Sequence, residues 1–289
     1  MEHHPILVTG AHRSGTTWAG RMLSIPLRVG YIHEPFNPER GVVCGNRFDK
    51  WFTHLSPSDS SGRQEYEACL RRALQFQYDP LSRAREGGLR DIPAAAYHMV
   101  RSTANQAIAS RPLMKDPISL LSAEWLYETF DMDVVVMVRH PAAFAGSLKA
   151  KDWTFPFEDF LTQTELMQTH FAPYREGIRA MHNRKSTIVE QAALLWRCLY
   201  SVVANYRKRY PSWEVVMYED LVSNPASHYQ CLYRKFGLRW TPRIRRKIER
   251  RTEANIKKWK RRLCRDEIRY LKQETSEVWS EFYSGEDWE

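Results

Sequence analysis

The sequence predicts an α/β fold in a single domain, with a central, mainly parallel sheet flanked by helices. The chain has 289 residues, of which 43% are hydrophobic and 12% aromatic, enough for one large core. Five short apolar runs alternate with segments of helical spacing or loop chemistry, which is typical of a parallel sheet covered on both faces. No internal repeat, low-complexity tract or linker divides the chain. We therefore treat residues 1–289 as one domain.

The first strand and the first helix are predicted near the N-terminus. An apolar run over 5–9 ends at a glycine, and residues 16–23 then show helical spacing, with three large apolar residues on one side. This is a strand, a loop and a helix in succession. Four further strands are predicted from short apolar runs at 27–32, 112–115, 134–138 and 214–218.

The strand pattern is interrupted twice. Within 41–111, a loop rich in Ser, Asp and Gly precedes helical patterns over 64–76 and 94–109, and a second helical stretch lies at about 154–183. We interpret both as helical insertions over the ligand-binding end of the sheet, where open α/β folds usually determine specificity. The alternative is that they are ordinary crossover helices. After residue 265, apolar residues at helical spacing predict a final amphipathic helix: Ile268, Leu271, Thr275, Val278 and Phe282.

Positive charge is concentrated near the C-terminus. The formal net charge is +9, yet the segment 241–265 alone has twelve Lys and Arg against two Glu, a local balance of +10. A solvated helix face, a nucleic-acid stripe and a clamp on a polyanionic ligand all fit such a segment. We describe residues 241–289 as a basic loop followed by the final helix, and charge alone leaves the partner open.

The cysteines and the apolar runs indicate a cytoplasmic protein. The most apolar stretch, 134–138, has the length of a strand and not of a membrane span, so no transmembrane segment is expected. The apolar run that begins at Ile6 leaves no room for a signal peptide before it. The five cysteines are scattered, odd in number and never arranged as CxxC, which argues against a disulfide framework and a zinc site: Cys44, Cys69, Cys198, Cys231 and Cys264.

The loop after the first strand carries the strongest chemical signal. Gly10 and Gly15 are spaced as in the P-loop pattern GxxxxGK[ST], but Thr16 replaces the lysine. A P-loop NTPase also needs an acidic residue after a downstream strand to organise Mg²⁺, and here Arg139 follows the fourth predicted strand. The loop still offers backbone N–H groups and a helix N-terminus to an anion, with Arg13 as its positive charge. The sequence therefore predicts a P-loop-like phosphate site without a metal, with hydroxyls from Ser14, Thr16 and Thr17.

A second anion site is predicted at the end of the fourth strand. Arg139 follows that strand directly, and His140 and Pro141 turn the chain into a helix that carries Ser147. A guanidinium at a strand end and a hydroxyl two helical turns later can bind a second phosphate through a charge-assisted contact. The alternative role for Arg139 is a structural ion pair.

These residues resemble those of a known family. The run from Arg13 to Trp18 looks like the 5′-phosphosulfate loop of the PAPS-dependent sulfotransferases, and Arg139 with Ser147 looks like their 3′-phosphate site, at the same offset. A third match is Tyr218, which opens a Tyr-Glu-Asp-Leu run after the fifth strand and whose counterpart in the family lies against the adenine. By the same resemblance Trp18 stacks on that ring. The matches span residues 6–221.

The resemblance implies a donor and an activity. The family moves a sulfuryl group from 3′-phosphoadenosine-5′-phosphosulfate (PAPS) in line to an acceptor hydroxyl or amine, without a metal, and releases adenosine 3′,5′-bisphosphate. Cations near the bridging oxygen stabilise the leaving phosphate. Arg13 stands where the cytosolic hormone- and phenol-type members carry lysine, and arginine is usual in the tyrosyl-protein and many bacterial members. Lys115, at a strand end, is the expected second cation.

The residue expected to act as general base differs between branches of the family. The cytosolic members have a histidine two positions after the lysine of the third strand, and here that position is Pro117. The tyrosyl-protein branch uses a glutamate after the second strand, where this chain has Glu34. We therefore expect Glu34 to deprotonate the acceptor, with Asp116 and His33 as lesser candidates. The alternative is that Glu34 only pairs with Arg13 and orders the site.

The basic C-terminal segment contains further candidate contacts. Related sulfotransferases close a late basic loop over the 3′-phosphate, but their Arg-Lys-Gly signature is absent here. Lys257 and Lys258 are therefore candidates by position alone.

Two other functions compete with sulfuryl transfer. A P-loop nucleotide or small-molecule kinase would have lost both its lysine and its magnesium aspartate. A nucleic-acid-binding protein that used 241–265 would leave both phosphate motifs unexplained, so we expect no nucleic-acid partner. The acceptor stays open between a natural-product phenol or other small molecule, a carbohydrate, a lipid-linked sugar and a peptide tyrosine. Three tryptophans suit an aromatic or sugar pocket, although nothing in the sequence brings them together: Trp51, Trp125 and Trp153.

Overall fold

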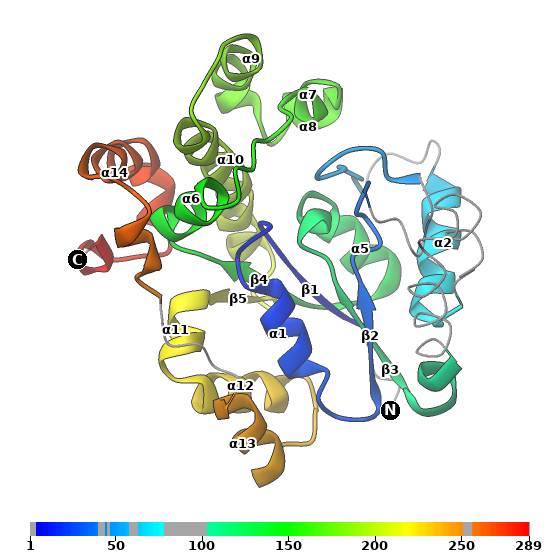
Figure 1. The fold of residues 1–289 in the computed structure, drawn as a ribbon. Helices are drawn as coiled ribbons and strands as arrows, with labels where there is room; N and C mark the ends of the chain where they lie inside the picture. The colour runs from blue at the N-terminus through cyan, green and yellow to red at the C-terminus, as the bar shows by residue number, and fades with distance from the viewer. Residues whose placement is uncertain are drawn as a thin grey trace, which may run out of the picture.

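A five-stranded sheet forms the centre of the molecule (Figure 1). The computed structural model describes residues 4–39, 44, 47–57, 63–77, 103–250 and 256–288. All strand pairs are parallel, in the order β2-β3-β1-β4-β5. The strands are β1 (Ile6–Gly10), β2 (Val29–His33), β3 (Arg111–Lys115), β4 (Asp133–Val138) and β5 (Glu214–Met217). The predicted single-domain α/β fold is confirmed, and each strand lies within two residues of its predicted position.

Side chains of the strands alternate between two cores, one on each face of the sheet. In β1, Leu7 packs on one face, whereas Ile6 and Val8 pack on the other, and all three are fully buried. The side chains of β4 alternate in the same way. Because successive side chains of a strand point to opposite faces, strands that are apolar throughout need cover on both.

Helices provide that cover. One face packs against α1 (Thr16–Leu23), α12 (Pro225–Lys235) and α13 (Pro242–Arg250). The other packs against α5 (Ala123–Phe130), α6 (Pro141–Lys149) and α10 (Ile188–Arg209). The final helix, α14 (Arg265–Trp279), lies outside α6 and α10 and contacts both. None of the helices in the described ranges is both long and apolar enough to cross a membrane.

The stretches predicted as insertions contain short helices. Between β2 and β3 lie α2 (Arg63–Leu74) and helical residues 103–108, while most of the predicted helix 94–109 falls outside the described residues. Between α6 and α10 lie three short helices, at the top of the view in Figure 1: α7 (Glu158–Leu161), α8 (Thr164–Gln168) and α9 (Arg175–Asn183). The helical pattern is broken before α9, where Pro173 has no N–H to donate.

The structure corrects the expectation for the cysteines. Cys44 and Cys69 form a disulfide, with their Cα atoms 5.6 Å apart, and it joins the segment after β2 to α2. The expectation was wrong because the number and local spacing of cysteines do not determine which of them pair. A disulfide requires that the fold bring two cysteines close together. These two are 25 residues apart in the sequence, so their local spacing does not indicate the contact. The free thiols in the described part of the chain are Cys198, which is buried, and Cys231 and Cys264, which are exposed.

A buried arginine ties the amino ends of the strands together. Arg111, at the start of β3, is 4% exposed. Its guanidinium donates to the carboxylate of Asp133 and to the backbone carbonyls of Phe236 and His4. Burial lowers the pKa of Arg111, and the charge of Asp133 acts in the opposite direction. The side chain thus connects β3 to β4, to the end of α12 and to the segment before β1.

We expect Arg111→Met to destabilise the fold by about 3 kcal/mol, because it leaves a carboxylate and two carbonyls without their partner. Lys208→Met is the matched control, since Lys208 pairs with Glu281 at an exposed position and loss of such a pair costs about 0–1 kcal/mol. Urea unfolding measures both variants. Equal losses in the two would contradict the role given to Arg111.

Candidate active site

Charged and aromatic side chains gather at one edge of the sheet. Since all five strands are parallel, their carboxyl ends share that edge. β1 is the point at which the strand order reverses, with β3 on one side and β4 on the other, and ligands of open α/β sheets bind in the crevice at such a point. The predicted site residues that close or directly follow the five strands are Arg13, Glu34, Lys115, Arg139 and Tyr218.

The loop after β1 has a backbone shaped for an anion. Gly10, Arg13 and Gly15 have φ values of 144°, 65° and 96°. α1 then begins at Thr16 without a side-chain cap, so no side chain occupies its first N–H groups. The hydroxyl of Ser14 is buried and has no hydrogen-bond partner among the described residues. The loop therefore presents donors that its own side chains leave unused.

Gly15 is required by the close approach of Tyr218. A Cβ at residue 15 would lie 2.3 Å from Tyr218 Cδ2, far inside contact distance, so no larger residue fits without a shift. Tyr218 begins α11 (Tyr218–Ser223) directly after β5. Its ring therefore lies against the loop after β1. Of the two threonines that follow Gly15, Thr16 is buried and Thr17 is exposed.

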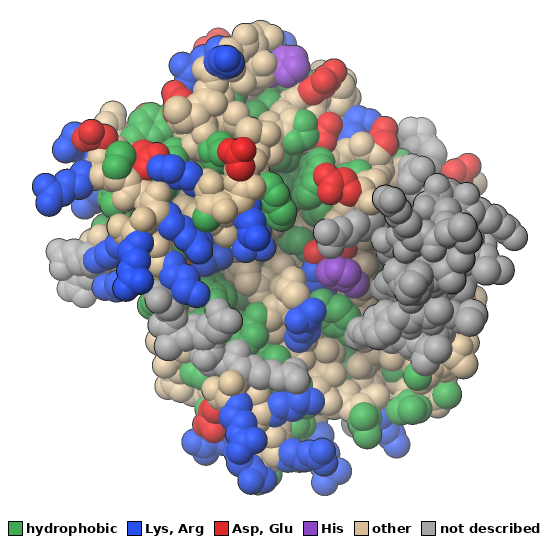
Figure 2. All heavy atoms as spheres, viewed as in Figure 1, with side chains coloured by type: hydrophobic (Ala, Val, Ile, Leu, Met, Phe, Trp, Pro, Cys, Tyr) green, Lys and Arg blue, Asp and Glu red, His purple; other side chains and the backbone are tan. Residues whose placement is uncertain are grey.

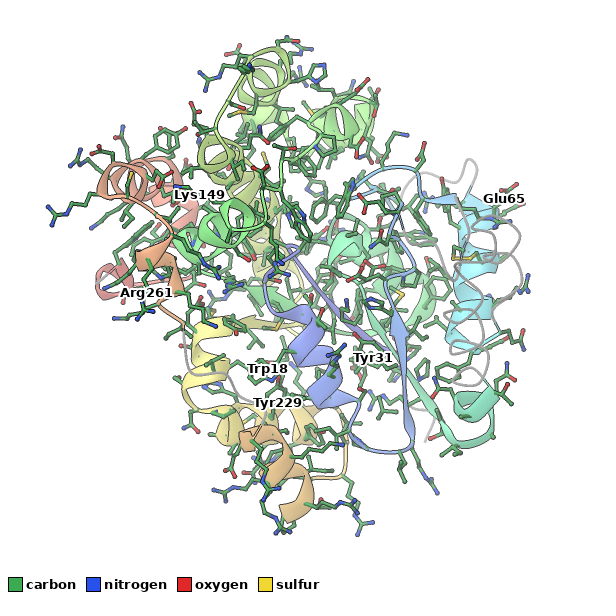
Figure 3. The ribbon with its side chains drawn as sticks, viewed as in Figure 1. Trp18, Tyr31, Glu65, Lys149, Tyr229 and Arg261 are labelled. Carbon is green, nitrogen blue, oxygen red and sulfur yellow. A yellow bond between two sulfur atoms is a disulfide. The ribbon has the colours of Figure 1, made fainter. Side chains whose placement is uncertain are left out.

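Trp18 lies between two tyrosines. Its ring centroid is 6.0 Å from that of Tyr218 and 5.4 Å from that of Tyr229, both in edge-to-face geometry. Figure 3 shows Trp18 and Tyr229 close together between α1 and α12. Trp18 Nε1 and the Tyr229 hydroxyl are buried and find no hydrogen-bond partner in the described ranges. The two residues expected at the adenine are thus neighbours, and Tyr229 is a third aromatic that the sequence analysis missed.

Three arginines lie around Ser147. Arg13 Nε donates to Ser147 Oγ at 3.0 Å. Arg139 donates to the backbone carbonyl of Arg13, and its guanidinium lies 4.9 Å from the ring centroid of Tyr218. Arg139 and Ser147 are therefore linked through Arg13. Burial lowers the pKa of Arg13, and the like charges of Arg139 and Arg262 lower it further. Like charges held this close together favour a polyanionic ligand.

Arg262 is the C-terminal cation that reaches this cluster, and the sequence analysis missed it. It follows the 3₁₀ turn η5 (Lys258–Arg261) and donates to the backbone carbonyl of Gly146 at 3.5 Å. Trp259, buried in the same turn, packs on α6. The predicted Lys257 and Lys258 are exposed. Trp259 and Arg262 both lie close to Gly146 of α6, a long-range contact that no local pattern in the sequence indicates.

The described parts of the basic segment, 241–250 and 256–265, lie in two places. Arg262 and η5 lie beside α6, on one face of the sheet, whereas α13 covers the other face. On α13, basic side chains line a hollow of about 370 Å³: Arg243, Arg246, Lys247 and Arg250. Figure 2 shows Lys and Arg gathered over both regions. Only the first region belongs to the candidate site.

Glu34 and Lys115 form a buried ion pair. Lys115 is fully buried and donates from Nζ to Glu34 Oε1, while Asn37 donates to the other oxygen at 2.8 Å. The backbone of Glu34 is left-handed, with φ 45°. Burial alone raises the pKa of Glu34, but the charges of Lys115 and His33 and two hydrogen bonds hold it below its usual value. Glu34 is therefore ionised at neutral pH, and its ion-pair partner is Lys115 and not Arg13.

Asp116 shapes the loop that carries Glu34. It is fully buried, and its two carboxylate oxygens accept from the N–H of Phe36 at 2.7 Å and the N–H of Ile118 at 3.0 Å. The second contact caps the turn η3 (Pro117–Ser122). Burial and the nearby charge of Glu34 raise the pKa of Asp116 to about 7. Its occupied oxygens favour a positioning role. The described residues contain no group of three His, Cys, Asp or Glu suited to a metal ion.

His12 packs against aromatic side chains at the candidate site. Its position there was not predicted from the sequence. Its ring centroid lies 6.0 Å from that of Trp51, 5.4 Å from that of Phe144 and 6.4 Å from that of Trp153. Burial lowers the pKa of His12 to about 4, so the imidazole is neutral at pH 7. Two of the three tryptophans considered for an acceptor pocket are thus brought together, while Trp125 is buried in α5.

His140 holds α6 against η5. Its Nδ1 accepts from the N–H of Ala142 at 3.2 Å, and its ring stacks on Trp259 with the centroids 5.6 Å apart. Nε2 is buried and has no hydrogen-bond partner among the described side chains and backbone. Burial lowers the pKa of His140 to about 4, against the opposing charge of Asp287. The helix that carries Ser147 therefore starts on a neutral histidine.

Comparisons with known proteins bear on the fold and the family. Residues 5–242 match the model of the sulfotransferase family. The sulfotransferase domain from the Synechococcus PCC 7002 olefin synthase is 17% identical, with a TM-score of 0.50 over 98% of this chain and 96% of that one. The sulfotransferase domain from the curacin biosynthetic pathway is 14% identical, with a TM-score of 0.50 over 96% of each chain. At these identities the structural likeness concerns the fold alone. A search of curated proteins finds no match.

We expect the contribution of His140 to stability to rise as the pH increases from about 4 to about 6.5. In that window the unfolded chain binds a proton at residue 140, with a pKa of about 6.5, whereas the folded chain does not, so each added pH unit favours folding. The contribution of His140 is about 3 kcal/mol, since one pKa unit corresponds to about 1.4 kcal/mol. Urea unfolding at several pH values should show a smaller rise in His140→Asn, which can still cap α6. His182→Asn, at an exposed site, is the control, and identical pH profiles for wild type and His140→Asn would refute the assignment.

Proposed function

Because this chain belongs to the sulfotransferase family, we propose that it transfers a sulfuryl group from PAPS to a hydroxyl or amine of an acceptor. The observation that carries this proposal is the cluster of Arg13, Arg139 and Arg262 around Ser147, beside the loop after β1. A nucleotide with phosphates at both its 3′ and 5′ positions needs two cationic sites close together. The proposed reaction uses no metal, since these cations and Lys115 supply the charge that Mg²⁺ provides in phosphoryl transfer.

The proposed donor contacts follow from this geometry. The loop binds the 5′-phosphosulfate through its N–H groups and polar side chains, from Arg13, Ser14, Gly15, Thr16 and Thr17. The 3′-phosphate binds Arg139, Ser147 and Arg262. The adenine lies against Trp18 and Tyr218. Lys257 and Lys258 add positive charge at the mouth of the site.

Transfer proceeds in line at sulfur. The acceptor oxygen forms a bond to sulfur while the bond from sulfur to the bridging oxygen of the 5′-phosphate breaks, and the electron pair of that bond stays on the bridging oxygen. Arg13 and Lys115 stabilise the charge that develops there. Glu34 takes the proton of the acceptor hydroxyl. Because its pKa is held low, Glu34 accepts the proton late, once bond formation to sulfur has made the hydroxyl acidic. The products are the sulfated acceptor and adenosine 3′,5′-bisphosphate.

We also propose a cytoplasmic location. The free thiols Cys198, Cys231 and Cys264 fit a reducing compartment. The disulfide between Cys44 and Cys69 is the opposing observation, because such bonds persist mainly in oxidising compartments.

The donor assignment is tested by a thermal-shift titration with adenosine 3′,5′-bisphosphate, with ATP and Mg²⁺, and with AMP. A ligand at about 100 times its Kd stabilises the native state by about 2.7 kcal/mol. We expect the largest rise in Tm from the bisphosphate, with no need for Mg²⁺. Arg139→Ala should lose the preference for the bisphosphate over AMP, and Arg243→Ala, on α13, should keep it. A larger shift with ATP and Mg²⁺ would instead support a kinase and overturn the proposal.

The base assignment is tested with Glu34→Gln. We expect turnover to fall by about 10²-fold or more, because proton transfer by a positioned base contributes that much, while the thermal shift caused by the bisphosphate stays unchanged. Glu65→Gln, on α2 and labelled in Figure 3, is the exposed control. Turnover near the wild-type rate in Glu34→Gln would move the proton acceptor to His33 or Asp116.

A further inference from the structure

The ring of His12 is enclosed by aromatic side chains on one side of the phosphate loop. Four rings surround it: Trp51, Phe144 and Trp153, described above, and Phe52, whose centroid lies 5.7 Å from that of His12. The four rings come from two segments that are far apart in the sequence, 51–52 and 144–153. Phe52 and Phe144 are buried, whereas Trp51 is partly exposed and Trp153 is 45% exposed. The cluster therefore has a closed floor and an open aromatic rim.

The open rim adjoins the candidate sulfuryl site. The guanidinium of Arg13 lies 5.6 Å from the ring centroid of Trp153. The charges of Arg13 and Glu34 both act on the pKa of His12, with opposite signs. His12 thus lies near Arg13, which is proposed to bind the phosphosulfate, near Glu34, the proposed base, and beside the aromatic side chains.

The imidazole of His12 has hydrogen-bonding capacity that the protein does not use. Nδ1 is buried, and no described residue pairs with it. No hydrogen bond joins Nε2 to a described residue, and His12 as a whole is partly exposed, so part of the residue is open to a bound molecule. A neutral imidazole can donate to or accept from a hydroxyl through such a nitrogen.

Strained backbone holds this surface in place. Phe52 and Asp152, which flank Trp51 and Trp153 in the sequence, have φ values of 57° and 53°. Such conformations cost about 1–3 kcal/mol each in residues other than glycine, and they concentrate where a site must be fixed. The N–H of Trp51 also donates to Asp159 of α7 at 2.8 Å. The aromatic rim is therefore preorganised.

We propose that His12, Trp51 and Trp153 form the acceptor subsite, and that it selects an uncharged alcohol whose hydroxyl is carried on a ring. The partly exposed indole rings of Trp51 and Trp153 pack on the flat side of the acceptor ring, and His12 holds its hydroxyl in front of the sulfur. A carboxylate on the acceptor is disfavoured by the apolar walls, which offer it no hydrogen-bond donor. This inference rests on the proposed sulfuryl transfer. A phenol and a sugar share this chemistry, and the experiment separates them.

The test uses the full chain with PAPS and three probe alcohols: 2-naphthol, octyl β-D-glucopyranoside and 1-octanol. We expect kcat/KM for at least one ring alcohol to exceed that for 1-octanol about tenfold or more, which corresponds to one good stacking contact. A preference for 2-naphthol identifies a phenol site, and a preference for the glucoside identifies a sugar site. Equal rates for all three alcohols would overturn the proposal.

Variants assign the effect to the named residues. Trp153→Ala should raise KM for the preferred ring alcohol about tenfold, with kcat little changed. Leu27→Ala, which removes a more exposed apolar side chain elsewhere, should change neither. His12→Phe keeps the ring packing and should lower kcat/KM about tenfold, and His12→Gln, which restores a polar group near the Nε2 position, should recover part of the loss. His182→Gln is the exposed control. If Trp153→Ala and His12→Phe behave like their controls, the subsite lies elsewhere.

A binding measurement separates this inference from the function on which it rests. Quenching of tryptophan fluorescence by 2-naphthol, in protein saturated with adenosine 3′,5′-bisphosphate, should weaken in Trp153→Ala whether or not transfer occurs. Absence of bisphosphate binding to the wild type would defeat the proposed function. Bisphosphate binding without transfer to either ring alcohol would overturn the acceptor subsite and leave the donor assignment intact.

Discussion

The candidate site contains a lysine, Lys115, whose charged side chain is shielded from water. Lys115 is fully buried at the end of β3, and α1 packs on it so closely that a Cβ at Gly20 would lie 3.0 Å from the lysine side chain. A buried ammonium is tolerated only when it is paired and hydrogen-bonded. Glu34 must therefore remain in contact with it. The left-handed backbone of Glu34 and the contact from Asn37 meet that requirement.

The charges in the rest of the site, unlike those of this pair, are not balanced within the described residues. Glu34 and Lys115 neutralise each other, whereas Arg13, Arg139 and Arg262 make no ion pair with a carboxylate in the described residues. An anionic ligand such as the proposed nucleotide would supply negative charge beside these arginines. His12 and His140, both held neutral by burial, add no further positive charge beside them. The site is thus strongly cationic where a nucleotide is proposed to bind, and close to neutral where an acceptor would enter.

Features determined by local sequence could be predicted. Features that depend on contacts between segments distant in the sequence could not. The strands follow from short apolar runs, and the loop from Arg13 to Thr17 follows from glycine spacing next to a strand and a helix. Arg262 was missed because its place depends on Trp259 packing against α6, more than a hundred residues away in the sequence. His12 lies within the recognised loop, but its aromatic partners come from distant segments. The disulfide of Cys44 and Cys69 belongs to the same class of long-range contact.

The contact between Gly15 and Tyr218 couples the two ends of the proposed nucleotide site. Since the tyrosine ring occupies the volume in which a Cβ would stand, the loop after β1 and the start of α11 cannot move independently. Arg139, which lies over the same ring and also donates to the loop, strengthens this connection. Ordering of one element therefore favours ordering of the other. Two fragments of the nucleotide, one with only the adenine and one with only the phosphates, are then expected to bind with positive cooperativity: each should raise the affinity for the other.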